Sequence, residues 1–442
     1  MKLRGRGKGA RRKGDPPDDA DRPAGGPPGA DRPAADLVVS GAAELLAPDP
    51  DVPGAVRRVP GGVLACAGDR ILAAGPADEV AGSVDLSSAV TVDAAGGIVL
   101  PGFIDCHTHL LFGGSRSREY AARLTRSRAA LEALGIETGI TASVGMTRAA
   151  TDDELLADAG ARLDAMLAQG TTTAESKTGY GLNAEQELRL LDLNGRLAAD
   201  HAVDLVSTLM AAHAFPAGLS MWERRSYVDE IVNEIIPAAA ERGAEFNDVY
   251  CDEGYFTVDQ ARRILEAGQR QGLAAKIHAD QYSAIGAAGL AAELKVVSAD
   301  HLNFTDDEDL HRLAAAGVVG VLMPLIDFAV AHSAPVNARR WVGAGLTVAL
   351  ATDLCPGGWA VSMPLAIQFA CRVSRLTPEE ALWAATAGAA RAVRREDRGV
   401  LEVGSLADAV VIAVPSLEEL VYRIGHPPVP YVVKSGRVVV GA

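Results

Sequence analysis

The middle of the chain, residues 101–395, alternates short apolar segments with longer amphipathic ones. Three of the amphipathic segments predict helices, at residues 153–170, 258–272 and 306–317, and the last two end at a glycine, which favours helix termination. The apolar segments predict eight strands, at residues 103–109, 171–181, 202–215, 246–252, 273–280, 295–302, 317–324 and 346–354. Eight strands alternating with helices over about 290 residues predict an α/β fold, the (β/α)8 TIM barrel. An open doubly wound sheet is the alternative, but no G-x-G-x-x-G turn follows a predicted strand.

The two ends of the chain, outside this predicted barrel, have a different sequence pattern. Strand-type runs broken by Gly, Pro or Asp occupy residues 36–100, and the same pattern returns at residues 396–442. We therefore expect one small, sandwich-like β domain built from these two ranges. Residues 1–35 are Gly, Pro and charged residues with almost no apolar side chains, which predicts a disordered leader. Its basic start leaves a nucleic-acid-binding tail as the alternative, and the lack of an apolar stretch argues against an export signal.

Composition narrows the class of protein further. The chain of 442 residues is 48% hydrophobic and 22% charged, which is typical of a globular protein with a sizeable core. A net charge of −15 argues against nucleic acid as the main partner. No run of about 18 apolar residues is present, so no membrane span is expected. Five cysteines, an odd and widely scattered number, predict reduced thiols in a cytoplasmic enzyme.

Polar side chains gather where the predicted strands end. In a (β/α)8 barrel the carboxyl ends of all strands open onto one mouth, where the active sites of this fold lie. The residues concerned are His107, His109, Lys177, Tyr180, His213, Asp252, His278, His301 and Asp353. Five histidines at one rim are hard to explain as packing, because each buried polar group needs a partner. The remaining histidines are predicted to be ordinary surface or helix residues: His201, His311, His332 and His426.

The H-x-H pair of His107 and His109 puts two imidazoles on one strand face, since residues i and i+2 of a strand point the same way. An isolated pair can simply cap a core strand. With His278 and Asp353, however, it offers three nitrogens and one carboxylate oxygen, which suits one divalent ion, Zn²⁺ or Fe²⁺. Such an ion lowers the pKa of a bound water to about 7. Asp353 is expected to take the water's proton, and His301 is expected to polarise a substrate carbonyl. The set predicts hydrolysis of an amide, cyclic amide or amidine.

The motifs around these residues resemble a known family. A barrel that begins with H-x-H, continues with two histidines and an aspartate, and is flanked by a β domain from both ends resembles the amidohydrolase superfamily. The segments PGFIDCHTHLLFGGSR, TTTAESKTGYGLNAEQELRLL, AAHAFP, KIHADQ and SADHL resemble the imidazolonepropionase family within it, from about residue 37 to the C-terminus. The resemblance implies hydrolysis of 4-imidazolone-5-propanoate to N-formimidoyl-L-glutamate in histidine degradation. It also implies a carboxylate-bearing small-molecule substrate and a homodimer.

The resemblance also assigns roles to single residues. It implies the same four metal ligands: His107, His109, His278 and Asp353. Arg116 would bind the propanoate carboxylate, which suits the two parallel donors of a guanidinium. Further substrate contacts would come from Tyr180, His213, Gln281, Cys355, Gly357 and Gly358.

Three features depart from the family pattern. Gln281 stands where glutamate is common, and glutamine can hydrogen-bond a ring but cannot move a proton. The catalytic set would therefore be Asp353 and His301 for proton transfer, with Gln281 beside them. Cys355 and Gly358 replace an asparagine-type side chain and a hydroxyl, and the segment 320–330 lacks a glycine after its proline. These changes bear on substrate preference more than on the reaction class.

Two alternatives stay open at this point. The first is a sister amidohydrolase acting on another small carboxylate-bearing cyclic amide or amidine, or an aromatic-amine deaminase. Arg116 together with Tyr180 favours a substrate that carries a carboxylate. The second is a metal-free barrel with a structural role, which would be expected to have lost a ligand, whereas all four are present.

Overall fold

The computed structural model describes residues 32–442, apart from residues 136, 426, 427 and 442. The predicted disordered leader therefore lies outside the described residues, except for its last four. Of these, Pro33 accepts a hydrogen bond from the backbone N–H of Asp85, and Ala35 donates one to the carbonyl of the same residue. These hydrogen bonds tie the last residues of the predicted leader to the chain at Asp85.

The predicted barrel is confirmed. Eight strands form one parallel sheet in the order β15-β14-β13-β12-β11-β10-β9-β8. Their bounds are β8 Phe103–Asp105, β9 Thr171–Lys177, β10 Asp204–Ala212, β11 Phe246–Cys251, β12 Ala274–Ala279, β13 Ser298–His301, β14 Val319–Leu322 and β15 Thr347–Leu350. A parallel bridge between Thr108 and Leu354 links the ends of the first and last strands, so the sheet closes at its carboxyl edge.

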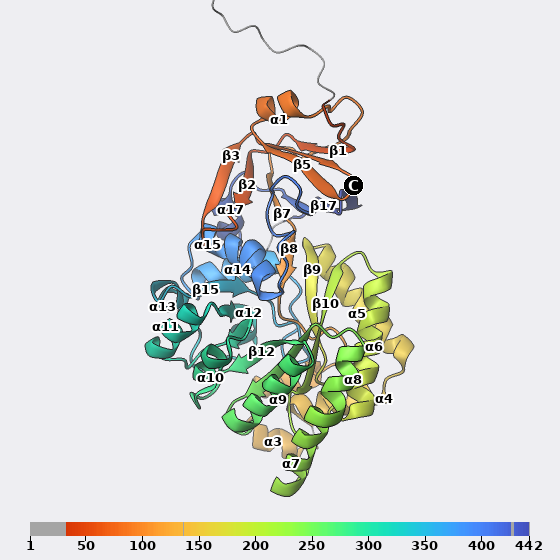
Figure 1. Ribbon diagram of the computed structural model, residues 1–442, viewed down its shortest axis with the longest axis vertical. Coiled ribbons are helices and arrows are strands. Elements are labelled where there is room, and N and C mark those ends of the chain that lie inside the picture. Colours follow the sequence, from red (N-terminus) through yellow and green to blue (C-terminus); the bar gives the residue numbers. More distant parts are fainter. Residues whose placement is uncertain (1–31, 136, 426–427, 442) are drawn as a thin grey trace, which may run out of the picture. The chain divides into compact units, whose positions relative to one another are not determined.

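Helices follow the strands and cover the outside of the barrel (Figure 1). Their bounds are α2 Ser117–Arg123, α3 Arg128–Ala133, α4 Gly139–Ala149, α5 Asp152–Leu167, α6 Ala184–Asp200, α7 Met221–Glu230, α8 Ile236–Glu241, α9 Val258–Arg270, α10 Ala287–Leu294, α11 Asp307–Ala316, α12 Pro324–Ala329, α13 Ala338–Gly343, α14 Met363–Arg372, α15 Pro378–Trp383 and α16 Ala389–Ala392. Two short π-helical turns, Ile231–Ile235 and Ala384–Gly388, join α7 to α8 and α15 to α16. The three helices predicted from the sequence are present as α5, α9 and α11.

Helix α9 shows why such segments fold as they do. Thr257 and Gln260 form a reciprocal capping box that satisfies backbone N–H groups at its first turn. Ile264 and Leu265 share one face and are fully buried against the barrel. Each apolar side chain of this size stabilises the folded chain by about 1.5–3 kcal/mol when removed from water.

The remaining strands form two sheets that use both ends of the chain. The four-stranded sheet has the order β5-β4-β1-β6, and the six-stranded sheet β18-β17-β16-β7-β2-β3. The bounds are β1 Leu37–Ser40, β2 Glu44–Pro48, β3 Val56–Pro60, β4 Val63–Ala67, β5 Arg70–Gly75, β6 Val90–Asp93, β7 Ile98–Pro101, β16 Ala409–Ile412, β17 Tyr431–Lys434 and β18 Arg437–Val440, with α1 at Ala77–Ser83 and α17 at Leu417–Tyr422. Leu37 and Leu64 of the first sheet share a buried cluster with Val99 and Val411 of the second. The strands from the two chain ends lie together in Figure 1 because β16 pairs antiparallel with β7.

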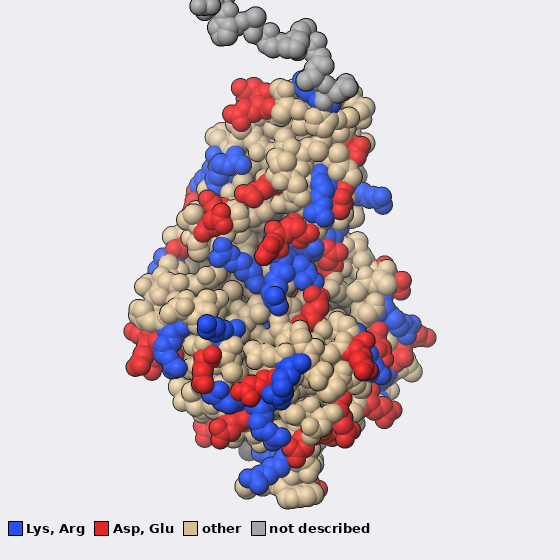
Figure 2. All heavy atoms as spheres, viewed as in Figure 1, with Lys and Arg blue, Asp and Glu red and all other residues tan. Residues whose placement is uncertain are grey.

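Charge and hydropathy of the surface agree with a globular chain. On the face shown in Figure 2, acidic and basic side chains alternate without a continuous basic field over the described residues. Many of them are paired, as Arg262 is with Glu293 at 2.6 Å.

Among the helices of the described residues, none is long and apolar enough to cross a membrane. All five cysteines are free thiols.

Candidate active site and metal centre

The four predicted metal ligands converge at the carboxyl ends of the barrel strands. His107 and His109 follow β8, His278 lies in β12, and Asp353 follows β15. Backbone hydrogen bonds from Asp353 N–H to the carbonyl of His107, and from His109 N–H to that of Leu354, tie the first strand end to the last. The ligand atoms of His107, His109 and Asp353 lie within 4.8 Å of one another. The ring centroids of His107 and His278 are 4.5 Å apart.

The donor set fits a divalent cation. Nε2 of His107 is buried and has no hydrogen-bond partner among the described residues, and Oδ1 of Asp353 lies 3.7 Å from it. Burial keeps the pKa of both His107 and His109 well below the ordinary value, so their rings are neutral. A neutral imidazole with an exposed lone pair is the form that binds a metal. A buried nitrogen without a partner, aimed at a carboxylate, is the arrangement that a bound cation would complete.

Two carboxylates that the sequence analysis did not single out orient these histidines. Oδ2 of Asp300 lies 2.6 Å from Nδ1 of His107, and Oδ1 of Asp248 lies 3.2 Å from Nδ1 of His278. A carboxylate on one ring nitrogen fixes the proton there and directs the other nitrogen to a metal. Both carboxylates are fully buried in the barrel interior. They belong to the middle of β11 and β13 rather than to the strand ends.

Lys177, which was predicted only as a polar strand end, lies at the centre of a buried charge cluster. Its Nζ is 2.6 Å from Asp248, 3.0 Å from Glu175 and 3.6 Å from Asp300. Burial opposes its charge, but the three carboxylates raise the pKa of Lys177 above the ordinary value, so it stays an ammonium ion. Burial likewise opposes ionisation of Asp248, yet His278 and Lys177 hold the pKa of that carboxyl well below its usual range. Glu175 also binds Nζ of Lys276 at 2.9 Å.

Asp353 and His301 are presented by unusual backbone. Their φ angles are +51° and +76°, in the left-handed region that non-glycine residues rarely adopt. Such conformations gather at functional sites, where the surrounding structure holds them. Burial raises the pKa of Asp353 to about 7 and lowers that of His301 well below its ordinary value. Nδ1 of His301 has no hydrogen-bond partner among the described residues.

A cavity of about 620 Å³ lies over this cluster. It is lined by most of the predicted site residues: His109, Arg116, Tyr180, His213, His278, Gln281, His301, Asp353, Cys355 and Gly357. Gly358 does not line it, and a Cβ at this position would overlap Cδ1 of Ile326. Asp252 also stays outside, since its carboxylate accepts 2.7 Å hydrogen bonds from the backbone N–H groups of Glu253 and Tyr282.

The loop after β9 carries Tyr180 and is shaped by Glu187. This carboxylate, at the start of α6, accepts hydrogen bonds from backbone N–H groups of Gly179, Gly181 and Leu182 at 2.7–2.9 Å. Gly179 has φ +114°, and a Cβ there would press on the ring of His213. His213 stacks on His109 with 4.8 Å between centroids, and burial lowers its pKa to about 3. The backbone geometry of this loop thus requires glycine at position 179.

Gln281 is held by two neighbours. Its Oε1 accepts a hydrogen bond of 2.5 Å from the hydroxyl of Tyr250, which leaves the amide NH₂ for the cavity. Its backbone carbonyl lies 2.8 Å from Nε2 of His332. Because Nδ1 of His332 accepts from the N–H of Ala334, Nε2 carries the proton and donates it to Gln281.

The prediction that His332 is an ordinary surface or helix residue is therefore wrong. Its ring is buried, lines the cavity and packs 5.0 Å from the ring of Tyr282. His311 is exposed on α11, and His201 bonds to Asp164 at the surface. His426 lies outside the described residues.

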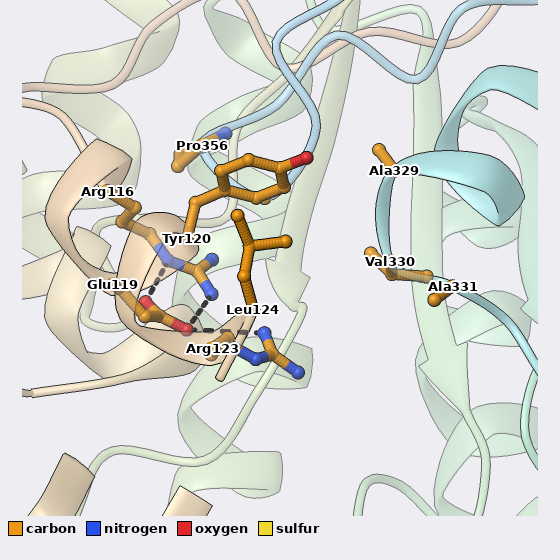
Figure 3. Close-up of a pocket in the computed structure, with 10 residues that line it drawn as sticks. Arg116, Glu119, Tyr120, Arg123, Leu124, Ala329, Val330, Ala331 and Pro356 are labelled. Carbon is orange, nitrogen blue, oxygen red and sulfur yellow. Dashed lines mark hydrogen bonds and ion pairs between the residues drawn. The ribbon is translucent and has the colours of Figure 1, made fainter. Parts of the chain in front are cut away.

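Arg116 lies at one side of the cavity and is held there by Glu119. Figure 3 shows this pair in a neighbouring pocket that both residues also line. Its Nε and Nη2 donate to the two oxygens of Glu119 at 2.6 and 2.9 Å. The N–H groups of Nη1 are on the opposite side of this pair, toward Gly357. Glu119 is not among the residues predicted from the sequence, although it lies three positions after Arg116, a spacing at which side chains meet on a helix.

A parallel barrel with H-x-H after its first strand and an aspartate after its last defines an amidohydrolase. The sequence pattern of the amidohydrolase family matches residues 119–440. An imidazolonepropionase of Geobacillus kaustophilus is 44% identical over 84% of this chain and 88% of its own, and one of Halobacterium salinarum is 43% identical over 92% and 98%. The chain belongs to the imidazolonepropionase family.

Solved structures show the same fold at lower identity. An atrazine chlorohydrolase from Arthrobacter aurescens TC1 superimposes with a TM-score of 0.68 and 19% identity over 92% of this chain and 95% of that chain. An adenosine deaminase from Xanthomonas campestris gives 0.65 and 18% over 93% and 94%. These two share the architecture of barrel and flanking β sheets with the present chain.

Proposed function

We propose that this chain hydrolyses 4-imidazolone-5-propanoate to N-formimidoyl-L-glutamate, a step of histidine degradation. The observation that carries the proposal is that one cavity joins the His109–Asp353 cluster to the guanidinium of Arg116. A ring amide at the cluster and a carboxylate at the guanidinium are the two ends of this substrate. The name shared by the relatives from Geobacillus and Halobacterium supports the same reaction.

We propose that one divalent ion, Zn²⁺ or Fe²⁺, is held by the four predicted ligands His107, His109, His278 and Asp353. The neutral rings and the unpartnered Nε2 of His107 support this set. The chlorohydrolase of the same fold was solved in complex with zinc. When bound, such an ion supplies Lewis-acid chemistry that activates a water at neutral pH.

The residues around the cavity would then have different roles in the hydrolysis. The bond between the ring carbonyl carbon and its nitrogen breaks, and the water's oxygen joins the carbon. One proton of the water passes to the leaving nitrogen, and the other is released when the new carboxylic acid ionises to a carboxylate. Asp353, which lines the cavity, is suited to accept that proton and return it to the leaving nitrogen. His301 faces the same cavity and would steady the developing charge on the carbonyl oxygen. The amide NH₂ of Gln281, together with Tyr180 and His213, would orient the ring.

The direct test is loss of the ultraviolet absorbance of fresh 4-imidazolone-5-propanoate on addition of zinc-loaded protein. Arg116→Ala should abolish turnover or strongly raise KM. Arg118→Ala, which changes an exposed arginine on helix α2 two residues further along, should leave KM unchanged. His109→Ala should lose bound metal and turnover together, and turnover retained without metal would contradict the ligand set. Metal-loaded wild type without turnover would exclude this substrate.

We further propose that the chain forms a homodimer and is located in the cytoplasm. The family resemblance implies a homodimer, which light scattering on the purified chain would test. Five free thiols fit the reducing cytoplasm. A monomer at micromolar concentration would contradict the proposed dimer.

A further inference from the structure

Glu119 has no part in the proposed reaction, yet it is the most buried residue of helix α2. Only 4% of it is exposed. Its two oxygens receive three guanidinium hydrogen bonds, two from Arg116 and one of 3.3 Å from Arg123. Figure 3 shows the carboxylate between the two guanidinium groups. Both of its oxygens also lie 3.4 Å from the backbone N–H of Gly139 at the start of α4.

The pairing decides which edge of Arg116 is free. A guanidinium offers five N–H donors in a planar fork. Glu119 occupies the edge made by Nε and Nη2, so Nη1 and the second hydrogen of Nη2 remain. A Cβ placed on Gly357 would lie 3.5 Å from Nη1, so the free edge faces the turn that lines the cavity. Two parallel donors on that edge match a carboxylate.

Pairing also removes conformational freedom. The side chain of Arg116 is 12% exposed in the ion pair. Without Glu119, the arginine would have to be ordered when the ligand binds, and ordering one such side chain costs up to about tenfold in affinity. A fixed fork avoids that loss.

Charge alone predicts the opposite effect. Arg116 and Arg123 carry two positive charges, and Glu119 cancels one of them. If Glu119 acted only through its charge, removing it would strengthen the binding of an anion. Whether removal of Glu119 weakens or strengthens anion binding therefore distinguishes a positioning role from a purely electrostatic one.

We propose that Glu119 is a positioning residue that presents the free edge of Arg116 to the carboxylate of the ligand. The inference rests on the proposed function for the identity of that ligand. It concerns binding, and its test needs no turnover.

The experiment measures the affinity of two stable probes, imidazole-4-propanoate and imidazole-4-propanamide, for the metal-loaded full chain by calorimetry. In Glu119→Gln the affinity for the propanoate is expected to fall by about three- to tenfold, while that for the propanamide stays the same. Arg118→Gln, on the same helix, should change neither. Glu119→Asp, which keeps the charge but has a shorter reach, should weaken propanoate binding by a smaller factor and provides a second variant if glutamine prevents folding. In the Arg116→Ala background, Glu119→Gln should have no further effect.

Three outcomes would overturn the inference. Tighter propanoate binding by Glu119→Gln would show that its charge dominates, and equal losses for both probes would show a general structural role. An unchanged propanoate affinity would show that Arg116 is ordered without Glu119. Failure of the wild type to hydrolyse 4-imidazolone-5-propanoate would instead count against the proposed function, because the probe affinities are read separately.

Discussion

Lys177→Met tests the buried charge cluster below the metal ligands. The ammonium lies 2.6 Å from Asp248 and 3.6 Å from Asp300, and all three side chains are fully buried. Removing one partner of a buried ion pair costs about 3–5 kcal/mol, because the other charge is left uncompensated. Glu175 keeps Lys276 at 2.9 Å, so the unpaired charge falls on the two aspartates.

We therefore expect the free energy of unfolding to fall by about 3–5 kcal/mol, a large part of the roughly 5–15 kcal/mol typical of a domain. Asp248 and Asp300 also hold His278 and His107, so metal affinity should fall by about 10- to 100-fold. Urea unfolding followed by circular dichroism in the presence of a chelator measures the first effect. Competition with a chromophoric chelator measures the second.

Lys434→Met is a matched control for this variant. Lys434, in strand β17 of a flanking sheet, is also buried. It bonds Asp408 at 2.8 Å and Asp204, the first residue of barrel strand β10 and so at the end opposite the site, at 2.7 Å. It should lower stability and leave metal affinity unchanged. The reasoning is refuted if Lys177→Met unfolds within about 1 kcal/mol of the wild type and binds metal equally well.

Three further changes probe single contacts. Tyr250→Phe removes the hydroxyl that donates to Oε1 of Gln281. The free energy of unfolding in urea should fall by about 1 kcal/mol, and KM should rise. An unchanged KM would show that Gln281 does not contribute to substrate binding. Gly358→Ala pushes a methyl group against Cδ1 of Ile326 and should lower stability by about 1–3 kcal/mol. Adding Ile326→Val should recover part of this loss, and thermal unfolding measures both effects. Burial raises the pKa of Cys371 to about 12. At pH 8, four units lower, about one thiol in 10⁴ is ionised, so alkylation followed by mass spectrometry should be slow and rise about tenfold per pH unit; rapid labelling at pH 8 would contradict this.

The barrel could be predicted because its strands are buried on both faces. Such strands read as continuous apolar runs, and helices between them show a different period. The end of β9 was harder to place. The predicted segment ran to residue 181, whereas the strand stops at Lys177, because Gly179 turns the chain with φ +114°. The pairing of β7 with β16 joins residues about 300 positions apart, and no local pattern specifies it.

His332 shows a different limit of sequence reasoning. It follows the short helix α12 rather than a strand, so the position of polar residues at strand ends does not identify it as a site residue. Its burial arises because Tyr282 and Phe304, from the loops after β12 and β13, pack on its ring at 5.0 and 5.9 Å. A single histidine in a polar segment carries no sign of such packing.

The charge cluster, in contrast, left a readable pattern that strand-end reasoning did not use. Side chains two residues apart on a strand share a face, and in a barrel the inward-facing ones stack in layers. Glu175 precedes Lys177 by two positions, and Lys276 precedes His278 by two. A charged residue two positions before a site residue therefore lies one layer deeper, where a charge is stable only when it is paired. Which charges meet across the interior, as Glu175 does with Lys276 from a strand that is not its neighbour, follows only from the closed barrel.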